Sequence, residues 1–516
     1  MARLFEYQSK RILKDIGIKV PLGDVADTPK RAIEIAEKIG YPVVLKVQVW
    51  EKERKKKGGI EFAENPDELK NKAENLLGKE WGEFKIKEIL VEKKIKIIQE
   101  MFAGIIIDDK KKKPLLVFSP VGGTGIEEIA KKHPEKIVKY YIDPLEGFYS
   151  FQAREILRKT GIKGKTLLRL ANTLALMYRA MRSYDARFLE INPLVLSEEE
   201  EVIALDAHIV IDDYAVYRHP ELGIEIAREF SRPPTELEKI AYEVEKNDYR
   251  GTFYFFQMVT KVPPDKKHIG FHGAGGGGSM MSADAVLSAG FKIANFTDTS
   301  GNPPSSKVYR AAKIILSQPN IVGYFASGSG LASQEQFHSA RGFVKAFLEE
   351  DIDIPAVLRL GGNYEEVAIE ILSKYLKNYK VEGYGKDDSP QFCAERLKKL
   401  VKENGYKMHK VKPHKDFMPK GDEYRIETLT GTVYIDHKVC ALCDKKPCVP
   451  ACNYNVLKIE DGKPVLAISA EDAKKGKCVE CLACEIACRF EGKNALYIHL
   501  PVPGLSEYRE KIIREA

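Results

Sequence analysis

The alternation of apolar and polar residues predicts an α/β protein. Thr28 followed by Pro29 marks the start of a helix, because threonine caps the first turn and proline suits the first helical position. Apolar residues then recur at helical spacing until Gly40. Residues 43–49 (VVLKVQV) form an apolar run with Lys46 in its middle, as expected of a strand. Further strands are predicted at residues 89–92 and 105–108.

From about residue 268 the pattern changes to a repeating unit of short apolar strand, small-residue loop and helix. The predicted strands of this region end at His272, Thr299, Ala326 and Leu360. Strands that are separated by helices need crossover connections, so the pattern predicts a parallel, doubly wound sheet. Ligands of such sheets bind at the carboxyl ends of the strands, where these loops begin.

A glycine-rich loop follows the first of these strands. Residues 272–279 read HGAGGGGS and precede a predicted helix. The amides of successive glycines can converge on an anion, and a helix N-terminus favours negative charge, so a phosphate or carboxylate ligand is predicted. A tight turn without a ligand is the alternative. The loops at 300–302 and 327–330 are expected at the same sheet edge. The glycines expected near the ligand are Gly273, Gly275, Gly328 and Gly330.

Composition narrows the range of functions. The chain has 516 residues, 44% of them hydrophobic and 30% charged, which is typical of a globular protein with three or four domains and excludes a disordered chain. The net charge of +7 is small for this length, so no nucleic-acid partner is predicted. Neither a signal peptide nor an apolar run of membrane-spanning length is recognised, so a cytoplasmic protein without a membrane partner is expected.

Two strand-like segments around an acidic turn predict a metal-binding hairpin. Residues 186–196 (ARFLEINPLVL) and 201–211 (EVIALDAHIVI) flank a turn centred on Glu199, and this register places Asn192 opposite Asp206. Because side chains alternate along a strand, four polar residues share one face. Oxygen ligands of this kind suit Mg²⁺, and a hairpin whose polar face is only hydrated is the alternative. The residues of this face are Glu190, Asn192, Asp206 and His208.

Eight of the nine cysteines lie between residues 440 and 488, which in a cytosolic chain indicates metal binding rather than disulfides. Their spacing, C-x2-C-x4-C-x3-C followed by C-x2-C-x2-C-x3-C, resembles that of bacterial ferredoxins with two 4Fe-4S clusters. Two four-cysteine zinc sites are the alternative. The resemblance implies a first cluster held by Cys440, Cys443, Cys448 and Cys488, and a second held by Cys452, Cys478, Cys481 and Cys484. The ninth cysteine, Cys393, is expected to be a buried apolar residue.

The segment LEINPLVL with the following LDA resembles the magnesium hairpin of the large (beta) subunit of succinyl-CoA synthetase, an ATP-grasp protein. Other segments agree in the same order: FEYQSKRIL, PVVLKVQV, ILVE, IDPLEG and AAKIILS. The similarity covers about residues 1–400. It implies ATP or GTP and Mg²⁺ as cofactors, and a small carboxylate and CoA as substrates.

The resemblance also implies roles for single residues. Lys46 and Arg54 would contact the nucleotide phosphates, and Glu92 the nucleoside. A lysine in a buried strand is unfavourable unless it meets a charge, which a phosphate supplies; a lysine that reaches water from an edge strand is the alternative. The other implied positions are Glu100 at the nucleotide, Asn192 and Asp206 at Mg²⁺, and Glu190 at a phosphorylated histidine.

Several positions depart from the family pattern. The family's glycine-rich loop after the lysine strand is here WEKERKKK, residues 50–57, and Gly125 stands where the family carries an acidic residue. His272 stands where the family has an asparagine that touches substrate, so it is predicted to be catalytic together with Glu190; a structural histidine whose hydrogen bonds are satisfied within the protein is the alternative. Residues 327–330 replace a Phe-Gly-Gly segment. These departures leave the identity of the carboxylate open.

A partner subunit is expected. The family's nucleophilic histidine and its CoA-binding domain belong to a small (alpha) subunit, and no G-x-G-x-x-G that opens a βαβ unit is found here. In the family, ATP phosphorylates that histidine, the phosphoryl group passes to a carboxylate, and the CoA thiol displaces phosphate. A redox partner is also expected if the cysteines hold iron.

The predicted fold class is α/β, with five segments: an ATP-grasp domain (1–245), a flavodoxin-like CoA-ligase domain (246–405), a linker (406–430), a ferredoxin-like α+β domain (431–500) and a tail (501–516). The predicted function is that of the large subunit of an ADP-forming carboxylate–CoA ligase with an attached electron-transfer module. The alternative is an electron-transfer or scaffold subunit whose ATP-grasp lobe has lost catalysis. A carboxylate–amine ligase is disfavoured by the flavodoxin-like half.

Overall fold

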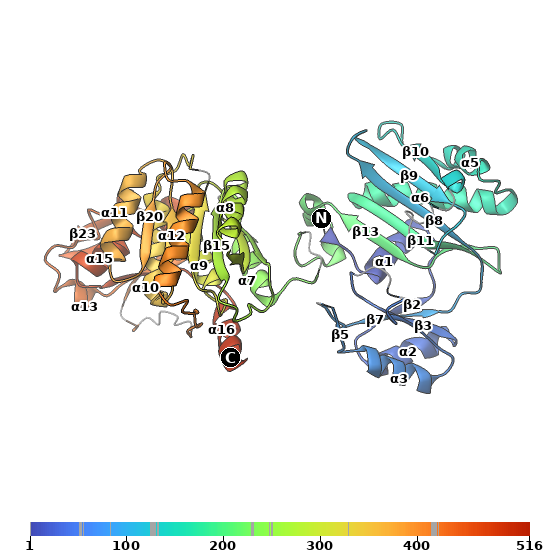
Figure 1. Cartoon of the computed structure of the whole chain (residues 1–516), viewed down its shortest axis with the longest axis horizontal. Helices are drawn as coiled ribbons and strands as arrows, with labels where there is room; N and C mark the ends of the chain where they lie inside the picture. The colour runs from blue at the N-terminus through green and yellow to red at the C-terminus, as the bar shows by residue number, and fades with distance from the viewer. Residues whose placement is uncertain are drawn as a thin grey trace. The chain divides into compact units, whose positions relative to one another are not determined.

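The computed structural model describes residues 2–50, 54, 56–82, 84–123, 131, 134–228, 232–246, 248, 251–328, 330–413, 420–421 and 423–515. The chain forms two compact units, Met1–Pro234 and Thr235–Ala516 (Figure 1). No helix among the described residues is long and apolar enough to span a membrane.

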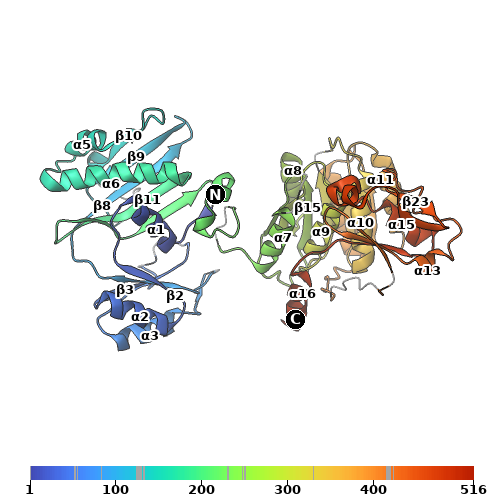
Figure 2. The same ribbon diagram turned by 180° about the vertical axis from the view of Figure 1, so that it is seen from behind.

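The larger sheet of the first unit is antiparallel and has the strand order β1-β13-β11-β8-β9-β10, with β12 paired to β11. Helices α1, α5 and α6 pack their apolar residues against it, and Figure 2 shows α6 lying across the sheet. Its elements are β1 (Ala2–Arg3), α1 (Glu6–Ile16), β8 (Ile97–Asp108), β9 (Lys113–Ser119), β10 (Val138–Tyr141), α5 (Ser150–Arg158), α6 (Gly164–Ser183), β11 (Ala186–Ser197), β12 (Val202–Ala204) and β13 (Ala207–Ile211).

A smaller antiparallel sheet, β2-β7-β3-β4, carries α2 and α3. Helix α2 begins as predicted, because Thr28 Oγ1 accepts a hydrogen bond from the Arg31 amide at 3.3 Å. Strand β3 pairs with β4 and β7 on its two sides, so Lys46 lies on an interior strand and the edge-strand alternative is wrong. The elements are β2 (Gly23–Ala26), α2 (Pro29–Ile39), β3 (Val43–Val47), β4 (Ile60–Ala63), α3 (Pro66–Leu76), β7 (Ile89–Lys93) and the separate pair β5 (Glu80–Trp81) and β6 (Phe84–Lys85).

The main sheet of the second unit has the order β14-β17-β15-β18-β19-β20, with β16 paired to β15. All pairs are parallel except β14 with β17, so the predicted parallel sheet is confirmed. Helices α8 and α12 pack on one face, and α9 and α10 on the other. The elements are α7 (Glu236–Lys246), β14 (Tyr254–Gln257), β15 (His268–Ala274), α8 (Gly276–Ser288), β16 (Lys292–Ile293), β17 (Asn295–Asp298), α9 (Ser305–Ile315), β18 (Tyr324–Gly328), α10 (Phe337–Glu350), β19 (Ala356–Arg359), α11 (Glu365–Tyr375), β20 (Val381–Tyr384) and α12 (Pro390–Glu403).

The cysteine-bearing region packs on α9 and α10 and shares one apolar core with them. All eleven residues of α9 are consequently buried, although one face of such a helix is ordinarily exposed. The elements are β21 (Tyr424–Glu427), β22 (Thr432–Ile435), α13 (His437–Cys440), β23 (Leu457–Glu460), β24 (Lys463–Leu466), α14 (Ala470–Asp472), α15 (Ala483–Glu491) and β25 (Leu496–His499). Short helical turns lie at Pro134–Lys136, Asp213–Arg218, Pro220–Leu222 and Ala473–Lys477.

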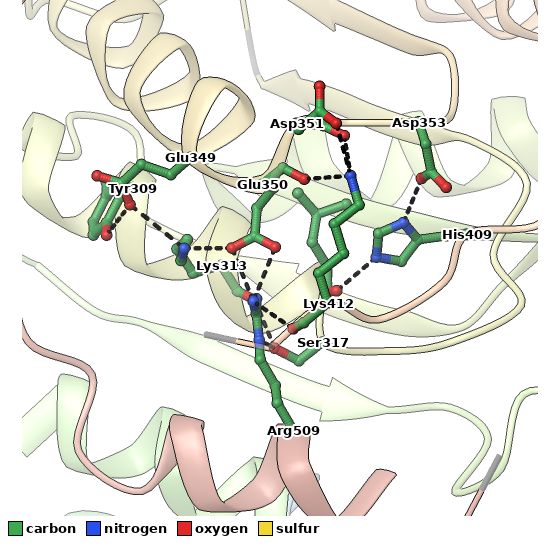
Figure 3. Close-up of polar contacts among 11 residues, drawn as sticks. Tyr309, Lys313, Ser317, Glu349, Glu350, Asp351, Asp353, His409, Lys412 and Arg509 are labelled. Carbon is green, nitrogen blue, oxygen red and sulfur yellow. Dashed lines mark hydrogen bonds and ion pairs between the residues drawn. The ribbon is translucent and has the colours of Figure 1, made fainter. Parts of the chain in front are cut away.

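The predicted tail forms helix α16 (Leu505–Glu515), which is anchored by a buried arginine. Both carboxylate oxygens of Glu350 lie 2.9 Å from the Arg509 guanidinium, which also donates to Ser317 Oγ at 2.7 Å and to the Lys313 carbonyl at 2.8 Å (Figure 3). Figure 3 also shows His409, from the segment predicted to be a linker, held by Asp353 at 2.7 Å. The C-terminal part of the chain is therefore fastened to α9 and α10.

Candidate functional site

The predicted hairpin is formed by β11 with β12 and β13. Leu196 pairs with Val202 and Leu194 with Ala204, as the turn at Glu199 requires. Beyond a short gap, β11 and β13 continue in the same register, in which Glu190 pairs with His208. The predicted register is therefore confirmed on both sides of Asn192, which lies on β11, and of Asp206, which lies in the gap between β12 and β13.

Three predicted residues meet beside Gly123 in the first unit. Asn192 Oδ1 accepts a hydrogen bond from the Gly123 amide at 3.2 Å, and its Nδ2 lies 3.5 Å from Glu190 Oε1. Glu100, on β8, projects against the same glycine: a Cβ atom at Gly123 would lie 1.9 Å from Glu100 Oε2. The φ angle of Gly123 is +79°, a conformation that favours glycine. The Gly123 turn therefore packs closely against these polar side chains.

The ammonium group of Lys46 lies in a buried cluster of charges. Its Nζ is 2.8 Å from Glu6 Oε1 and 3.0 Å from Glu92 Oε2, and donates to the Leu205 carbonyl at 2.5 Å. Lys10 Nζ shares the same three partners, at 2.7 Å from Glu6 Oε1, 2.6 Å from Glu92 Oε1 and 2.7 Å from the Leu205 carbonyl. The two lysines thus bridge α1, β7 and the hairpin.

Arg54 completes this charge cluster. Its Nη2 lies 2.7 Å from Glu6 Oε2 and 2.8 Å from Asp206 Oδ2, and its Nη1 donates to the Val47 carbonyl at 3.0 Å. The cluster therefore contains three cations and three carboxylates, all of them buried or nearly so except Asp206, whose side chain is 33% exposed. Its members are Lys10, Lys46, Arg54, Glu6, Glu92 and Asp206.

The charges of the cluster hold one another in the ionised form. Burial alone would raise the pKa of Glu6, but Lys10, Lys46 and Arg54 outweigh it and keep that pKa well below its usual range. Burial alone would lower the pKa of Lys46, whereas Glu6 and Glu92 raise it. A polyanionic ligand would therefore meet cations that are charged and already paired.

Glu6 and Lys10 are cluster members that the sequence pattern does not single out. Both belong to the segment FEYQSKRIL, and their spacing of four residues is that of a helical ion pair. Such pairs usually lie on an exposed surface, so the spacing alone does not indicate a site. Residues 51–53 and 55 of the charged loop, and Gly125, lie outside the described residues.

In the second unit, the glycine-rich loop connects β15 to α8, which begins at Gly276 rather than near Met280. Gly275 has a φ angle of +93°, and its amide donates to Asp298 Oδ1 at 3.0 Å. A Cβ atom at Gly273 would lie 2.3 Å from Ser279 Oγ, so this glycine permits close packing of the loop on the helix. Asp298 was not predicted from the sequence. It accepts a hydrogen bond from the Gly275 amide, one of the loop amides predicted to bind an anion.

His272 is buried and neutral. Its Nδ1 lies 2.6 Å from Tyr324 Oη and its Nε2 3.2 Å from Thr299 Oγ1. Burial lowers the pKa of His272 to about 3, so the ring carries no charge near neutral pH. The imidazole can therefore orient the two hydroxyls but cannot neutralise a carboxylate.

A pocket that opens to solvent lies at the carboxyl ends of β15, β18 and β19. Arg359 lies in its wall and donates to the carbonyls of Gly328, at 2.9 Å, and Lys386, also at 2.9 Å. Gly330 packs on the same guanidinium, because a Cβ atom there would lie 2.9 Å from Nη2. Ser329 is outside the described residues. Of the residues predicted at this edge, His272, Gly301, Ser327 and Gly328 line the pocket, whereas Gly273, Gly275 and Gly330 are not among its lining residues.

Four of the eight cysteines between residues 440 and 488 line a second pocket, whose lining is largely apolar. They are Cys452, Cys478, Cys481 and Cys484, the same four that the ferredoxin resemblance assigns to the second cluster. Burial raises the pKa of Cys484 well above its usual range, and its neighbours Cys481, Cys478 and Cys452 raise it further. Cys452 thus lies with the cysteines of the second run and not with those of its own.

The other four cysteines also lie near one another. Burial raises the pKa of Cys440 to about 11, with further contributions from Cys488 and Cys443, and that of Cys448 to about 12, with Cys488 again beside it. Cys488 Sγ accepts a hydrogen bond from the Ala495 amide at 3.1 Å. Among the described residues, no three His, Cys, Asp or Glu side chains converge on one point as the ligands of a single metal ion would.

Cys393 lies outside both groups of thiols. It is fully buried on α12 in the apolar core on one face of the parallel sheet, as expected.

Comparison with known proteins identifies relatives of most of the chain. An ATP-grasp domain family model matches residues 3–196. The beta subunit of GDP-forming succinate–CoA ligase from Thermus thermophilus is 38% identical over 369 residues, 72% of this chain and 93% of that protein. The beta subunit of the ADP-forming enzyme from Rubrobacter xylanophilus is 32% identical over 404 residues, 78% of this chain and 100% of that protein.

A solved structure shares the fold. The structure of ATP citrate lyase from Methanothrix soehngenii in complex with citrate and coenzyme A superposes with a TM-score of 0.63 and covers 78% of this chain and 99% of that one. The two chains are only 20% identical, so the similarity shows the fold alone. Each of these matches leaves more than a fifth of the present chain uncovered.

Proposed function

Because this chain belongs to the family of succinate–CoA ligase beta subunits, we propose that it is the large subunit of a carboxylate–CoA ligase driven by a nucleoside triphosphate. Such an acid–thiol ligase acts together with an alpha subunit. The observation that carries the proposal is the buried charge cluster of Lys46, Arg54 and Asp206, which joins the lysine strand to the Asn192 hairpin. We infer formation of ADP, and the relatives include both ADP-forming and GDP-forming enzymes.

Within this proposal, the first unit binds the nucleotide. Lys46 and Arg54 contact its phosphates, Glu92 holds the nucleoside, and Glu100 lies at the edge of the same site. Asn192 and Asp206 are proposed to hold Mg²⁺, because amide and carboxylate oxygens are ligands that this ion takes together with water and phosphate oxygens. The ion supplies neutralisation of phosphoryl charge when it is bound.

The chemistry involves a histidine of the alpha subunit as the nucleophile. Its ring nitrogen bonds to the γ-phosphorus as the bond to the β-phosphate oxygen breaks and the nucleoside diphosphate leaves. The carboxylate substrate then takes the phosphoryl group, and the CoA thiol attacks the acyl carbon and displaces phosphate. Glu190 is proposed to meet the phosphorylated histidine, and its position beside Asn192 on β11 supports this role.

The carboxylate is proposed to bind at the pocket of the second unit. Supporting features are its place at the carboxyl ends of parallel strands and Gly328 in its lining, and the ligand is proposed to reach Gly273, Gly275 and Gly330 as well. His272 is proposed to orient hydroxyl groups there, since its neutral ring bonds to Tyr324 and Thr299. The strand order of this sheet supports a flavodoxin-like CoA-ligase domain over residues 246–405.

We propose that residues 431–500 form a ferredoxin-like domain with two 4Fe-4S clusters. The fit is supported by the grouping of thiols, in which Cys452 joins the second run and Cys488 lies beside Cys440 and Cys448. A redox partner would exchange electrons with this domain. The remaining proposed segments are the ATP-grasp domain (1–245), the linker (406–430) and the tail (501–516), in a cytoplasmic protein.

A second candidate is an electron-transfer or scaffold subunit whose first unit binds nucleotide without catalysis. Two observations favour it. Arg54 is engaged by Glu6 and Asp206, and His272 is enclosed and uncharged.

Formation of acyl-CoA separates the two candidates. The chain is purified without oxygen together with its companion subunit and is supplied with Mg²⁺, CoA, ATP or GTP, and a panel of small carboxylates. The ligase proposal predicts thioester that depends on the triphosphate. If no carboxylate yields thioester although clusters and companion are intact, the scaffold candidate is favoured.

A further inference from the structure

Glu6 contacts two of the cations that the proposed function assigns to the nucleotide phosphates. Its Oε1 lies 2.8 Å from Lys46 Nζ and its Oε2 2.7 Å from Arg54 Nη2. The Glu6 side chain is only 2% exposed, so water does not screen these contacts. Glu6 therefore contacts the same two cations that a triphosphate would need.

Its position in the chain favours a permanently ionised carboxylate. Glu6 is the first residue of α1, where the helix dipole stabilises negative charge. Lys10, one turn further along, lies 2.7 Å from the same Oε1. Glu6 thus has a cation of its own helix that the phosphates do not require.

Lys10 also secures Glu92 independently of Glu6. Its Nζ contacts both carboxylate oxygens of Glu92, at 2.6 and 2.7 Å. When phosphate oxygens take Lys46 and Arg54, Lys10 therefore remains as a counter-ion for both carboxylates. A ligand that displaces Glu6 from Lys46 and Arg54 therefore leaves Glu6 paired with Lys10.

We propose that Glu6 is a displaceable counter-ion of the phosphate site, which competes with the ligand for Lys46 and Arg54 and thereby selects for polyphosphates. A singly charged anion gains too little from the two cations to displace a buried carboxylate, whereas a chain of phosphates brings several charges to the same place. This inference rests on the proposed nucleotide site and adds a positioning residue to it. Neither the sequence pattern nor the family resemblance assigned Glu6 a role.

Calorimetric titration of the chain with its companion subunit tests the proposal. The probes are ATP, GTP and the corresponding monophosphates, with Mg²⁺ present. Glu6→Gln removes the charge and keeps the size of the side chain. The matched control is Asp15→Asn, which removes an exposed carboxylate from the same helix.

The proposal predicts that Glu6→Gln binds triphosphate at least about tenfold tighter, as expected when a competing close charge is removed. The gain should be smaller for monophosphates and absent in Asp15→Asn. It should also disappear when Lys46→Met is added to Glu6→Gln. A purely structural role would lower the melting temperature without this dependence on phosphate number.

Unchanged or weaker triphosphate binding by folded Glu6→Gln overturns the inference. If that variant does not fold, Glu6→Asp serves instead, since its shorter side chain must release Lys46 or Arg54; it is then expected to bind more tightly, and equal or weaker binding overturns the inference. If the wild-type complex binds no triphosphate at all, the proposed function itself fails, an outcome distinct from a normal wild-type titration without a gain in the variant.

Discussion

Lys345 of α10 lies 2.6 Å from Glu485 of α15, the residue that follows Cys484, and both side chains are buried. The same ammonium group is 2.8 Å from Glu349 and 4.0 Å from the centre of the Tyr497 ring. The pKa values of the two carboxylates that contact Lys345 shift in opposite directions. Burial raises the pKa of Glu485 despite Lys345, whereas Lys345 and Lys313 overcome burial and lower that of Glu349 to about 2.

This contact makes the cysteine-bearing region an integral layer of the second unit. Lys345 and Glu349 stand on the outer face of α10, which would meet water if the layer were absent. Arg310 of α9 is held in the same way, because it donates to the carbonyls of Pro501, at 2.9 Å, and Thr430, at 2.8 Å. Charged residues of both helices therefore have their partners more than a hundred residues further along the chain.

Replacing Lys345 by Met should destabilise the second unit, because Glu485 is left buried without its cation. Loss of one partner of a buried pair costs about 3–5 kcal/mol, so the melting temperature of this unit should fall by roughly 5–15 °C in calorimetry. The control is Lys374→Met, which breaks the half-exposed pair with Glu491 at 2.9 Å. A fall as small as that of the control would show that the buried pair does not stabilise the layer.

The stability of the second unit should depend on pH through His272. The folded protein keeps this ring neutral down to a pKa of about 3, whereas in the unfolded chain the ring binds a proton near its ordinary pKa of 6.5. The unfolded state therefore binds more protons between these values, and stability falls as pH decreases below 6.5. Between pH 6.5 and pH 5 the loss is about 2 kcal/mol.

The His272→Asn variant lacks this group and isolates its contribution. Thermal unfolding of both proteins is followed from pH 7.5 to pH 5, a range in which other groups titrate equally in the two. The melting temperature of the wild type should decline more steeply than that of the variant. If the melting temperatures of the two proteins depended equally on pH, the result would contradict a buried neutral His272.

Asp206 should be needed for phosphoryl transfer more than for nucleotide binding. Replacement by Asn removes the carboxylate proposed to hold Mg²⁺ and should lower transfer of label from γ-labelled triphosphate at least about 100-fold, while the nucleotide still binds. Chelation of divalent ions in the wild type should have the same effect. Glu199→Gln, in the exposed turn of the same hairpin, is the control. Unchanged transfer of label by Asp206→Asn would show that Asp206 is not needed for phosphoryl transfer.

The cysteine grouping predicts which substitutions remove the same cluster. Anaerobically purified protein should contain about eight iron atoms and as many sulfides per chain. Cys452→Ser and Cys484→Ser should each remove the same half of the iron and the same reduced-cluster spectrum, although the two residues belong to different runs. Cys393→Ser, in the apolar core, should leave the iron content and the reduced-cluster spectrum unchanged. Zinc without sulfide in the wild type would contradict the iron–sulfur assignment.

Local patterns predicted the features that depend on neighbouring residues. The register of the hairpin follows from strand alternation and a short turn, so the pairing of Leu194 with Ala204 and of Leu196 with Val202 could be derived before any coordinates. The parallel sheet followed similarly from the repeated strand, loop and helix. The helix cap at Thr28 is a third local feature that was predicted correctly.

Features that depend on distant residues could not be derived in this way. Glu6 and Lys10 form an ordinary helical pair in the sequence, and only the fold brings Glu92 and Arg54 to them. Likewise, Lys345 occupies a helix position that periodicity assigns to the surface, and the layer that buries it comes from much later in the chain. Burial of a charge reflects tertiary packing, which periodicity within one element does not contain.

The most direct measurement is a phosphorylation assay on the complex purified without oxygen. The chain and its companion subunit are mixed with Mg²⁺ and γ-labelled ATP or GTP, and both subunits are examined for acid-labile label. The proposed function predicts phosphohistidine on the companion subunit and its loss when the correct carboxylate and CoA are added. A complex with intact clusters that acquires no label from either triphosphate would contradict it.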